Sequence, residues 1–73
     1  MDAIKNYQEK ILTEIYENQI PFTLFTMNGY QLRGILLGWD DNVIIIEVDG
    51  RQQMIYKHAV STLAPHRSLE TLM

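Results

Sequence analysis

Lys57 and His58 are adjacent, and their side chains are the best suited in this chain to bind a ligand. A lysine supplies a compact positive charge for phosphate, and a histidine supplies ring nitrogen donors and a flat surface. Neither Gly nor Pro occurs between Tyr56 and Val60, so the pair is predicted to lie at a tight corner between two short strands. A symmetric assembly would repeat this corner as a ring of donors. By residue type alone, such a pair is also common at exposed turns.

Catalysis and metal binding find little support in the sequence. Acid–base catalysis needs two groups within reach of one bond, but His58 has no carboxylate beside it, and Asp40-Asp41-Asn42 is typical of a turn. The chain has no cysteine and only two histidines, His58 and His66, which is too few for a convincing zinc site. We therefore predict that the protein is not an enzyme and uses neither a metal nor a cofactor.

The chain is 73 residues long, which is one small domain. Such a domain buries only about 60% of its unfolded surface, and it commonly gains stability from disulfides, metals or self-association. Without cysteine, self-association is the remaining source. The net charge of −3 gives no general attraction for phosphate. Neither a secretory peptide nor an apolar run of roughly 18 residues is present, so we expect a cytoplasmic protein with no membrane partner.

A helix is predicted at about residues 6–18, before the strands that it would cover. Apolar side chains recur there at helical spacing and would pack on a sheet; they are Ile4, Tyr7, Ile11, Leu12 and Ile15. Asn6 and Glu9 form a plausible capping pair at the start of the helix, and Asn18 can end it.

From Phe22 onward the hydrophobic pattern has a period of two, which predicts strands. Five are expected, at residues 22–27, 30–39, 43–48, 51–56 and 60–63. Asn28-Gly29 predicts a type I′ hairpin turn, and Gly34 with Gly38 predicts a bulge or sharp bend in the second strand. The fold class is α+β, mainly β, with an SH3-like or OB-like partly open barrel. Residues 1–65 would form this domain, and residues 66–73 a flexible tail without a clear packing role.

Two motifs resemble those of the Hfq family of bacterial Sm-like RNA-binding proteins, and the similarity covers about residues 6–65. The segment from Asn28 to Gly34, followed by Gly38-Trp39-Asp40, resembles the first Sm motif. The segment from Tyr56 to Thr62 resembles the second, and Gln31-Leu32-Arg33 is closest to the Gram-positive version. The resemblance implies an Sm-like homohexameric ring, in which the fourth strand of one subunit pairs with the fifth strand of its neighbour.

The resemblance also implies two surfaces for single-stranded RNA, with small regulatory RNAs and messenger RNAs as partners. The proximal surface, around the pore on the face that bears the helix, would bind U-rich RNA through Gln8, Asp41, Asn42, Tyr56, Lys57 and His58. The distal surface, on the opposite face, would bind A-rich RNA through Phe25, Gly29, Tyr30, Gln31, Leu32, Arg33, Gln53, Ser61 and Thr62.

Two regions depart from the family pattern. The family often carries an arginine-rich patch on the helix at the rim of the ring, where this chain has Tyr16, Glu17 and Gln19. The family also commonly places an aromatic residue for uracil stacking two positions after the motif aspartate, where this chain has Asn42. The alternative function is an SH3-like protein-interaction module without an RNA role, but no acidic aromatic groove for Pro-rich peptides is evident.

Overall fold

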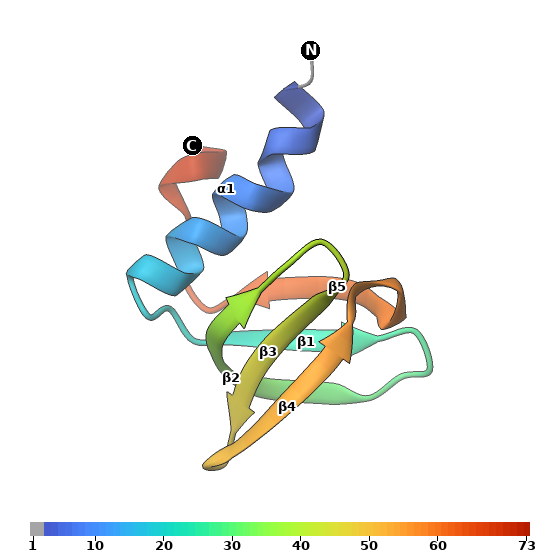
Figure 1. Ribbon diagram of the computed structural model, residues 1–73. Helices are drawn as coiled ribbons and strands as arrows, with labels where there is room; N and C mark the ends of the chain where they lie inside the picture. The colour runs from blue at the N-terminus through green and yellow to red at the C-terminus, as the bar shows by residue number, and fades with distance from the viewer. Residues whose placement is uncertain (1–2) are drawn as a thin grey trace.

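The computed structural model describes residues 3–73, with side chains from Tyr7 onward. One helix, α1 (Ala3–Glu17), precedes five strands, which are β1 (Phe22–Thr26), β2 (Gln31–Trp39), β3 (Val43–Val48), β4 (Arg51–Tyr56) and β5 (Val60–Pro65). A short 3-10 helix, η1 (Lys57–Ala59), joins β4 to β5, and a second, η2 (Glu70–Leu72), lies in the tail. Figure 1 shows α1 on one side of a strongly bent sheet, with η2 running beside it. The predicted helix and bent five-stranded antiparallel sheet are confirmed.

The helix begins earlier than predicted, so Asn6 lies inside it and does not precede it. The capping contact predicted for the Asn6 side chain lies outside the described side chains. At the other end, Gln19 has a φ of 52°. The N–H of Ile20 donates to the carbonyl of Ile15 at 3.0 Å, and the N–H of Gln19 donates to that of Tyr16 at 3.3 Å. This pair of bonds is a Schellman cap, which satisfies the last carbonyls of the helix.

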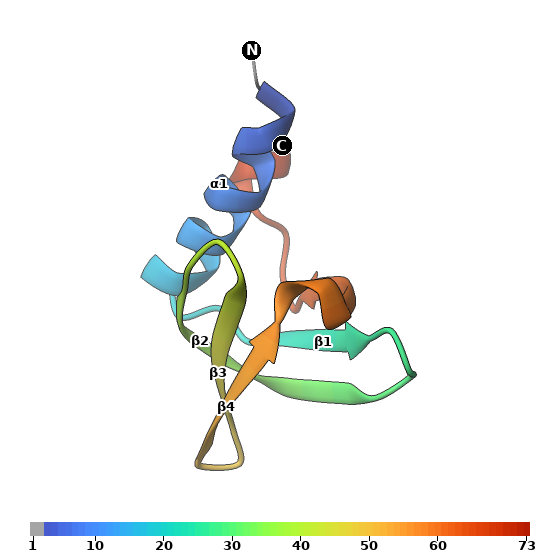
Figure 2. The same cartoon turned by 45° about the vertical axis from the view of Figure 1, so that its right-hand side comes forward.

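The strands are antiparallel and lie in the order β4-β3-β2-β1-β5. β2 pairs with β1 as far as Gly34 and with β3 from Ile35 onward, so the bend falls at Gly34. A Cβ at Gly34 would collide with the carbonyl oxygen of Glu47, and only glycine permits this close approach. A bulge between Leu36 and Gly38 bends the strand further. The prediction of a bent second strand is confirmed, and Figure 2 shows the two halves of the sheet turned away from each other.

Of the two hairpin turns, the one between β1 and β2 differs from the prediction. Gly29 has a φ of 95°, but Asn28 does not have a positive φ, so the type I′ turn predicted there is wrong. The β1–β2 connection spans residues 27–30 and is closed by the N–H of Gly29 donating to Thr26 at 3.1 Å. The two-residue connection from β3 to β4 instead has positive φ at both Asp49 (52°) and Gly50 (79°). Two-residue loops favour this conformation because its twist matches that of the strands.

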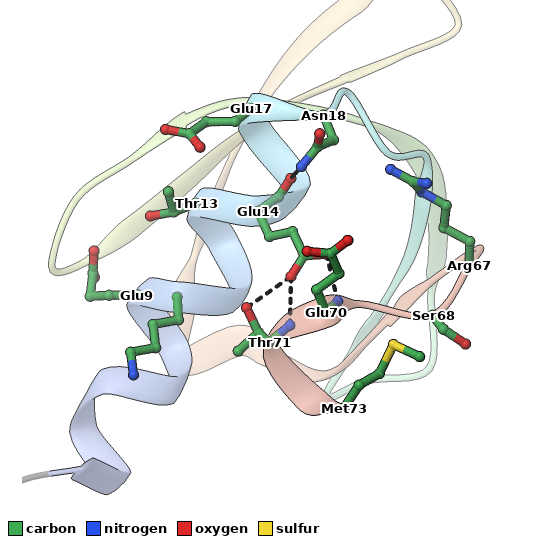
Figure 3. A pocket seen from close by; sticks show the side chains of 11 residues that line it. Glu9, Thr13, Glu14, Glu17, Asn18, Arg67, Ser68, Glu70, Thr71 and Met73 are labelled. Atoms are coloured by element: carbon green, nitrogen blue, oxygen red, sulfur yellow. Dashed lines mark hydrogen bonds between the residues drawn. The ribbon is translucent and has the colours of Figure 1, made fainter.

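The tail packs against α1, although no clear packing role was predicted for it. Leu69 is 2% exposed and belongs to the core cluster. The carboxylate of Glu14 accepts the backbone N–H groups of Glu70 at 2.7 Å and Thr71 at 2.9 Å, and the Thr71 hydroxyl at 2.8 Å (Figure 3). These bonds pin η2 beside the helix. The flexibility expected for the tail stays a prediction.

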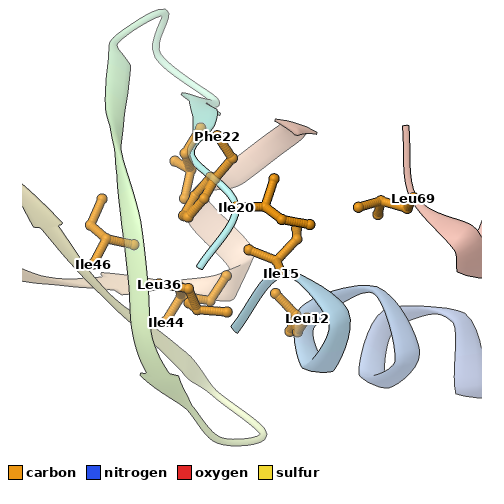
Figure 4. Packing of buried hydrophobic residues seen from close by; sticks show 9 residues of the cluster. Leu12, Ile15, Ile20, Phe22, Leu36, Ile44, Ile46 and Leu69 are labelled. Atoms are coloured by element: carbon orange, nitrogen blue, oxygen red, sulfur yellow. The ribbon is translucent and has the colours of Figure 1, made fainter. Parts of the chain in front are cut away.

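The core lies between α1, the inner face of the bent sheet and the tail (Figure 4). Its members are Leu12, Ile15, Ile20, Phe22, Leu24, Leu36, Ile44, Ile46 and Leu69. This core is small, as expected for a short chain, and we expect self-association to supply further stability. Among the described residues, no helix is long and apolar enough to cross a membrane.

Candidate nucleic-acid interface

Three elements meet at one end of the sheet and carry the six residues predicted for the proximal surface. They are α1, the β2–β3 turn and the corner where β4 passes into η1. We call these residues the proximal cluster: Gln8, Asp41, Asn42, Tyr56, Lys57 and His58. The backbone N–H of Lys57 donates to the carbonyl of Asn42 at 2.8 Å, which ties η1 to the turn. The Tyr56 and His58 rings are stacked, with centroids 5.5 Å apart and planes 16° from parallel.

Gln8 and Lys57 line one pocket of about 270 Å³. Its other walls are apolar and consist of Ile11, Leu12, Ile44, Val60 and Leu63. The Nζ atom of Lys57 is buried and has no hydrogen-bond partner among the described residues. An ammonium group without a partner is costly to bury. The pocket is therefore suited to an acceptor oxygen of a ligand, with the Gln8 amide available beside it.

The β2–β3 turn is fixed by the carboxylate of Asp40. Its Oδ1 accepts the backbone N–H of Asn42 at 2.8 Å and that of Val43 at 2.9 Å. These two donors, and then the charge of Lys57, hold the pKa of Asp40 below its ordinary value of 3.8. Asp40 thus stays ionised and holds the turn, which agrees with the turn predicted from the sequence. Its neighbours Asp41 and Asn42 are exposed.

No aromatic ring of the β2–β3 turn is available for base stacking in the described structure. Asn42 has no ring, and the nearby Trp39 has other partners. The Trp39 indole N–H donates to Oε1 of Glu9 at 3.0 Å, and its ring meets the edge of Tyr16 at a centroid distance of 5.7 Å and an angle of 72°. The sequence pattern predicts only a helix-capping role for Glu9. The signal for its contact with Trp39 is that a partly buried tryptophan N–H needs an acceptor.

Four of the residues predicted for the distal surface lie on one face of β1, β2 and β5. Phe25 is paired with Gln31 on one side and Thr62 on the other, and Thr23 is paired with Arg33. Directly paired residues share a face. We call Phe25, Gln31, Arg33 and Thr62 the distal row. The opposite face carries Leu24 and its partners, which point into the core.

The other predicted distal residues lie around or away from this row. Tyr30 is 67% exposed at the hairpin beside Gly29, and the Ser61 hydroxyl donates to the carbonyl of Phe25 at 3.2 Å. Leu32 faces the other way and packs against the core. Gln53 lies on β4, at the far edge of the sheet. A single chain therefore does not bring Leu32 or Gln53 into the distal row.

A helix on a five-stranded, strongly bent antiparallel sheet, with the first motif along β2 and the second at the corner between β4 and β5, defines an Sm-like protein. A family model described as "Hfq protein" matches residues 7–70. The chain belongs to the Hfq family.

Similar proteins agree with this assignment. The RNA-binding protein Hfq of Shouchella clausii is 44% identical over 70 residues, which cover 96% of this chain and 91% of the relative. The RNA-binding protein Hfq of Halalkalibacterium halodurans is 43% identical and covers 96% of this chain and 90% of its own length. A crystal structure of an Hfq described as a pleiotropic translational regulator superposes with a TM-score of 0.79 at 39% identity, covering 81% of this chain and 98% of the other.

Proposed function

We propose that this protein is an RNA-binding Sm-like ring that acts as an RNA chaperone in the cytoplasm, with U-rich RNA at the proximal cluster and A-rich RNA at the distal row. It would help small regulatory RNAs to meet messenger RNAs, and no catalytic step is proposed. Family membership supports RNA binding in general. The observation that carries the proximal site is the buried ammonium of Lys57, which has no hydrogen-bond partner among the described residues and lies in a pocket shared with Gln8.

Assembly into a homohexamer is supported by the two edges of the sheet. β4 and β5 are the outermost strands, so each has one row of unpaired backbone groups. Pairing β4 of one copy with β5 of the next satisfies both rows and closes without leaving an edge. Met54 and Tyr56 on β4 are each 51% exposed, which gives this pairing apolar surface to bury.

The same pairing completes both RNA surfaces. Gln53 on β4 would reach the β5 of the neighbouring copy, which carries Ser61 and Thr62. It would also bring the η1 corners of the six copies around one pore, with Lys57 and His58 repeated in a ring. Six ammonium groups at one pore offset the unfavourable net charge of the chain, because local field outweighs distant charge at physiological salt.

The exposed side of α1 is excluded from this proposal. Tyr16, Glu17 and Gln19 are exposed where the family often has arginines. Glu17 gives this surface a negative charge in place of the positive charge of arginine, and a negative surface repels phosphate.

Light scattering combined with oligonucleotide binding tests the proposal. Six copies of 8.5 kDa give an assembly of about 51 kDa. Oligo-A and oligo-U should both bind at one stated salt concentration, and oligo-U binding should weaken more steeply as salt rises, since it depends on charge. A stable monomer at micromolar concentration contradicts the ring. If neither oligo-A nor oligo-U binds, the proposed RNA-binding function is contradicted.

A further inference from the structure

The hydrogen bond between Glu9 and Trp39 joins the helix to the sheet next to the proximal cluster. The Trp39 indole N–H donates to Oε1 of Glu9 at 3.0 Å. The two residues are 30 positions apart in the chain, and the bond lies where α1 crosses the end of β2. Tyr16, also on α1, meets the Trp39 ring edge-on. One indole therefore makes both a directional polar contact and an aromatic contact with the helix.

Each partner in this bond is the sequence neighbour of a residue that either lines the proximal pocket or fixes the β2–β3 turn. Gln8 precedes Glu9 on α1 and lines the pocket. Trp39 precedes Asp40, whose carboxylate holds the turn of Asn42. The carbonyl of Asn42 in turn accepts the backbone N–H of Lys57. A continuous series of hydrogen bonds and peptide links thus runs from Gln8 to Lys57 through the Glu9–Trp39 bond.

We propose that Glu9 and Trp39 are positioning residues for U-rich RNA. Their hydrogen bond would hold Gln8 opposite Lys57, so that one ligand contacts the amide and the ammonium together. The inference rests on the proposed proximal function. Trp39 would orient Gln8 and would not itself stack on a base, because its indole already contacts Glu9 and Tyr16.

The charge of Glu9 and its positioning role predict opposite changes in RNA affinity when the side chain is removed. Glu9 is an exposed carboxylate on the helix that lines the pocket. By charge alone, its removal should strengthen the binding of a phosphate backbone. A positioning role predicts the opposite result, a weaker grip on U-rich RNA. The direction of the change therefore separates the two roles of one side chain.

The experiment compares variants of the full-length chain by oligo-U and oligo-A binding at one salt concentration. Glu9→Ala should lower oligo-U affinity about three- to tenfold, the effect of one lost hydrogen bond, and should leave oligo-A affinity unchanged. Glu9→Gln keeps an acceptor oxygen and removes the charge, so it should bind oligo-U as well as the unchanged chain or better. Glu17→Ala is the matched control, since it removes the same charge from the exposed face of the same helix.

Trp39→Phe supplies the second half of the test because it removes the indole N–H and keeps a ring against Tyr16. It should reproduce the loss seen in Glu9→Ala, and the double variant should lose no more than either single one, since both act through one bond. Additive losses overturn the proposal, as does stronger oligo-U binding by Glu9→Ala. Equal losses on oligo-U and oligo-A indicate a general folding defect and also overturn it. If the unchanged chain does not bind oligo-U, the proposed proximal function itself fails; if it binds and no variant differs, only this inference fails.

Discussion

The proximal cluster draws its side chains from a helix, a turn and the corner after β4, whereas the distal row lies on three strands that are paired directly. In the distal row, strand register alone places Phe25 beside Gln31 and Thr62. In the proximal cluster, Gln8 lines the same pocket as Lys57 only because α1 is docked in one orientation. The distal row should therefore tolerate changes in helix docking that the proximal cluster does not.

Both surfaces depend on the bend in β2, so the largest effect is expected from Gly34→Ala. A Cβ there collides with the backbone of Glu47, and overpacking of this kind costs about 1–3 kcal/mol or more. The variant should unfold at lower urea concentration and lose both RNA activities. Gly38→Ala is the control, because a Cβ at Gly38 meets nothing within 4 Å. Normal stability of Gly34→Ala would contradict the role assigned to the bend.

Aromatic substitutions in the hairpin should separate the two surfaces. Tyr30→Ala should weaken oligo-A binding by about 1–3 kcal/mol, the value of one base stack, without changing oligo-U binding. Phe25→Ala should act in the same direction, and the exposed Met27 of the same hairpin provides a control, Met27→Ala. Titration of each variant with both oligonucleotides measures the effect. Losses of equal size on the two ligands would show that the assignment of the faces is wrong.

A ring introduced at position 42 should strengthen only the proximal surface. Asn42 is exposed, and replacing it with phenylalanine would supply the missing stacking partner, for a gain of roughly 5- to 150-fold in oligo-U affinity. Asn42→Leu adds apolar surface without an aromatic face and should gain much less. The prediction fails if Asn42→Phe leaves oligo-U binding unchanged while Lys57→Ala abolishes it. The pocket would then bind by charge and His58 alone.

The smallest effect concerns the tail, which lies outside both surfaces. Hydrogen bonds from Thr71 and Glu70 lower the pKa of Glu14 from its ordinary value of 4.5. A lowered pKa means that the stabilisation of the docked tail is complete above pH 4.5 and is lost as the pH falls through the lower value. Glu14 lines a groove between α1 and the tail. Other charged side chains line the same groove, namely Arg67, Lys10, Glu9, Glu17 and Glu70.

Amide exchange at Glu70 and Thr71 measures this docking. Protection should be high at neutral pH and should fall in acid, and Glu14→Ala should lose it at every pH. RNA binding by Glu14→Ala should match that of the unchanged chain. Equal protection in Glu14→Ala and in the unchanged chain would show that the carboxylate does not hold the tail.

Local patterns in the sequence predicted the strands because alternation and turn residues are local signals. They misplaced the type I′ turn, since Asn28-Gly29 carries the stronger signal but Asp49-Gly50 has the two-residue loop that selects this conformation. Packing of the tail was missed because Glu14 and Thr71 are 57 positions apart. A local pattern cannot report such a contact.

The candidate site shows the same division. Its residues were predicted from the resemblance to the Hfq family, and the structure places Gln8 and Lys57 on one pocket. The stacking of Tyr56 on His58 and the bond from Trp39 to Glu9 could not be predicted, because both depend on side-chain orientation in the folded chain. Leu32 and Gln53 show the limit most clearly, since a family resemblance names residues without stating which face or which edge of the sheet each one occupies in a single chain.

The most direct test of two independent RNA surfaces is oligo-U binding in the presence of saturating oligo-A. If the two surfaces are independent, the oligo-U affinity should be unchanged. The mass of one assembly of about 51 kDa, six copies of 8.5 kDa, should rise by the masses of both ligands. Lys57→Ala should remove the oligo-U signal and leave oligo-A bound. Displacement of oligo-U by oligo-A would mean that the two ligands share one surface, which contradicts two independent RNA surfaces.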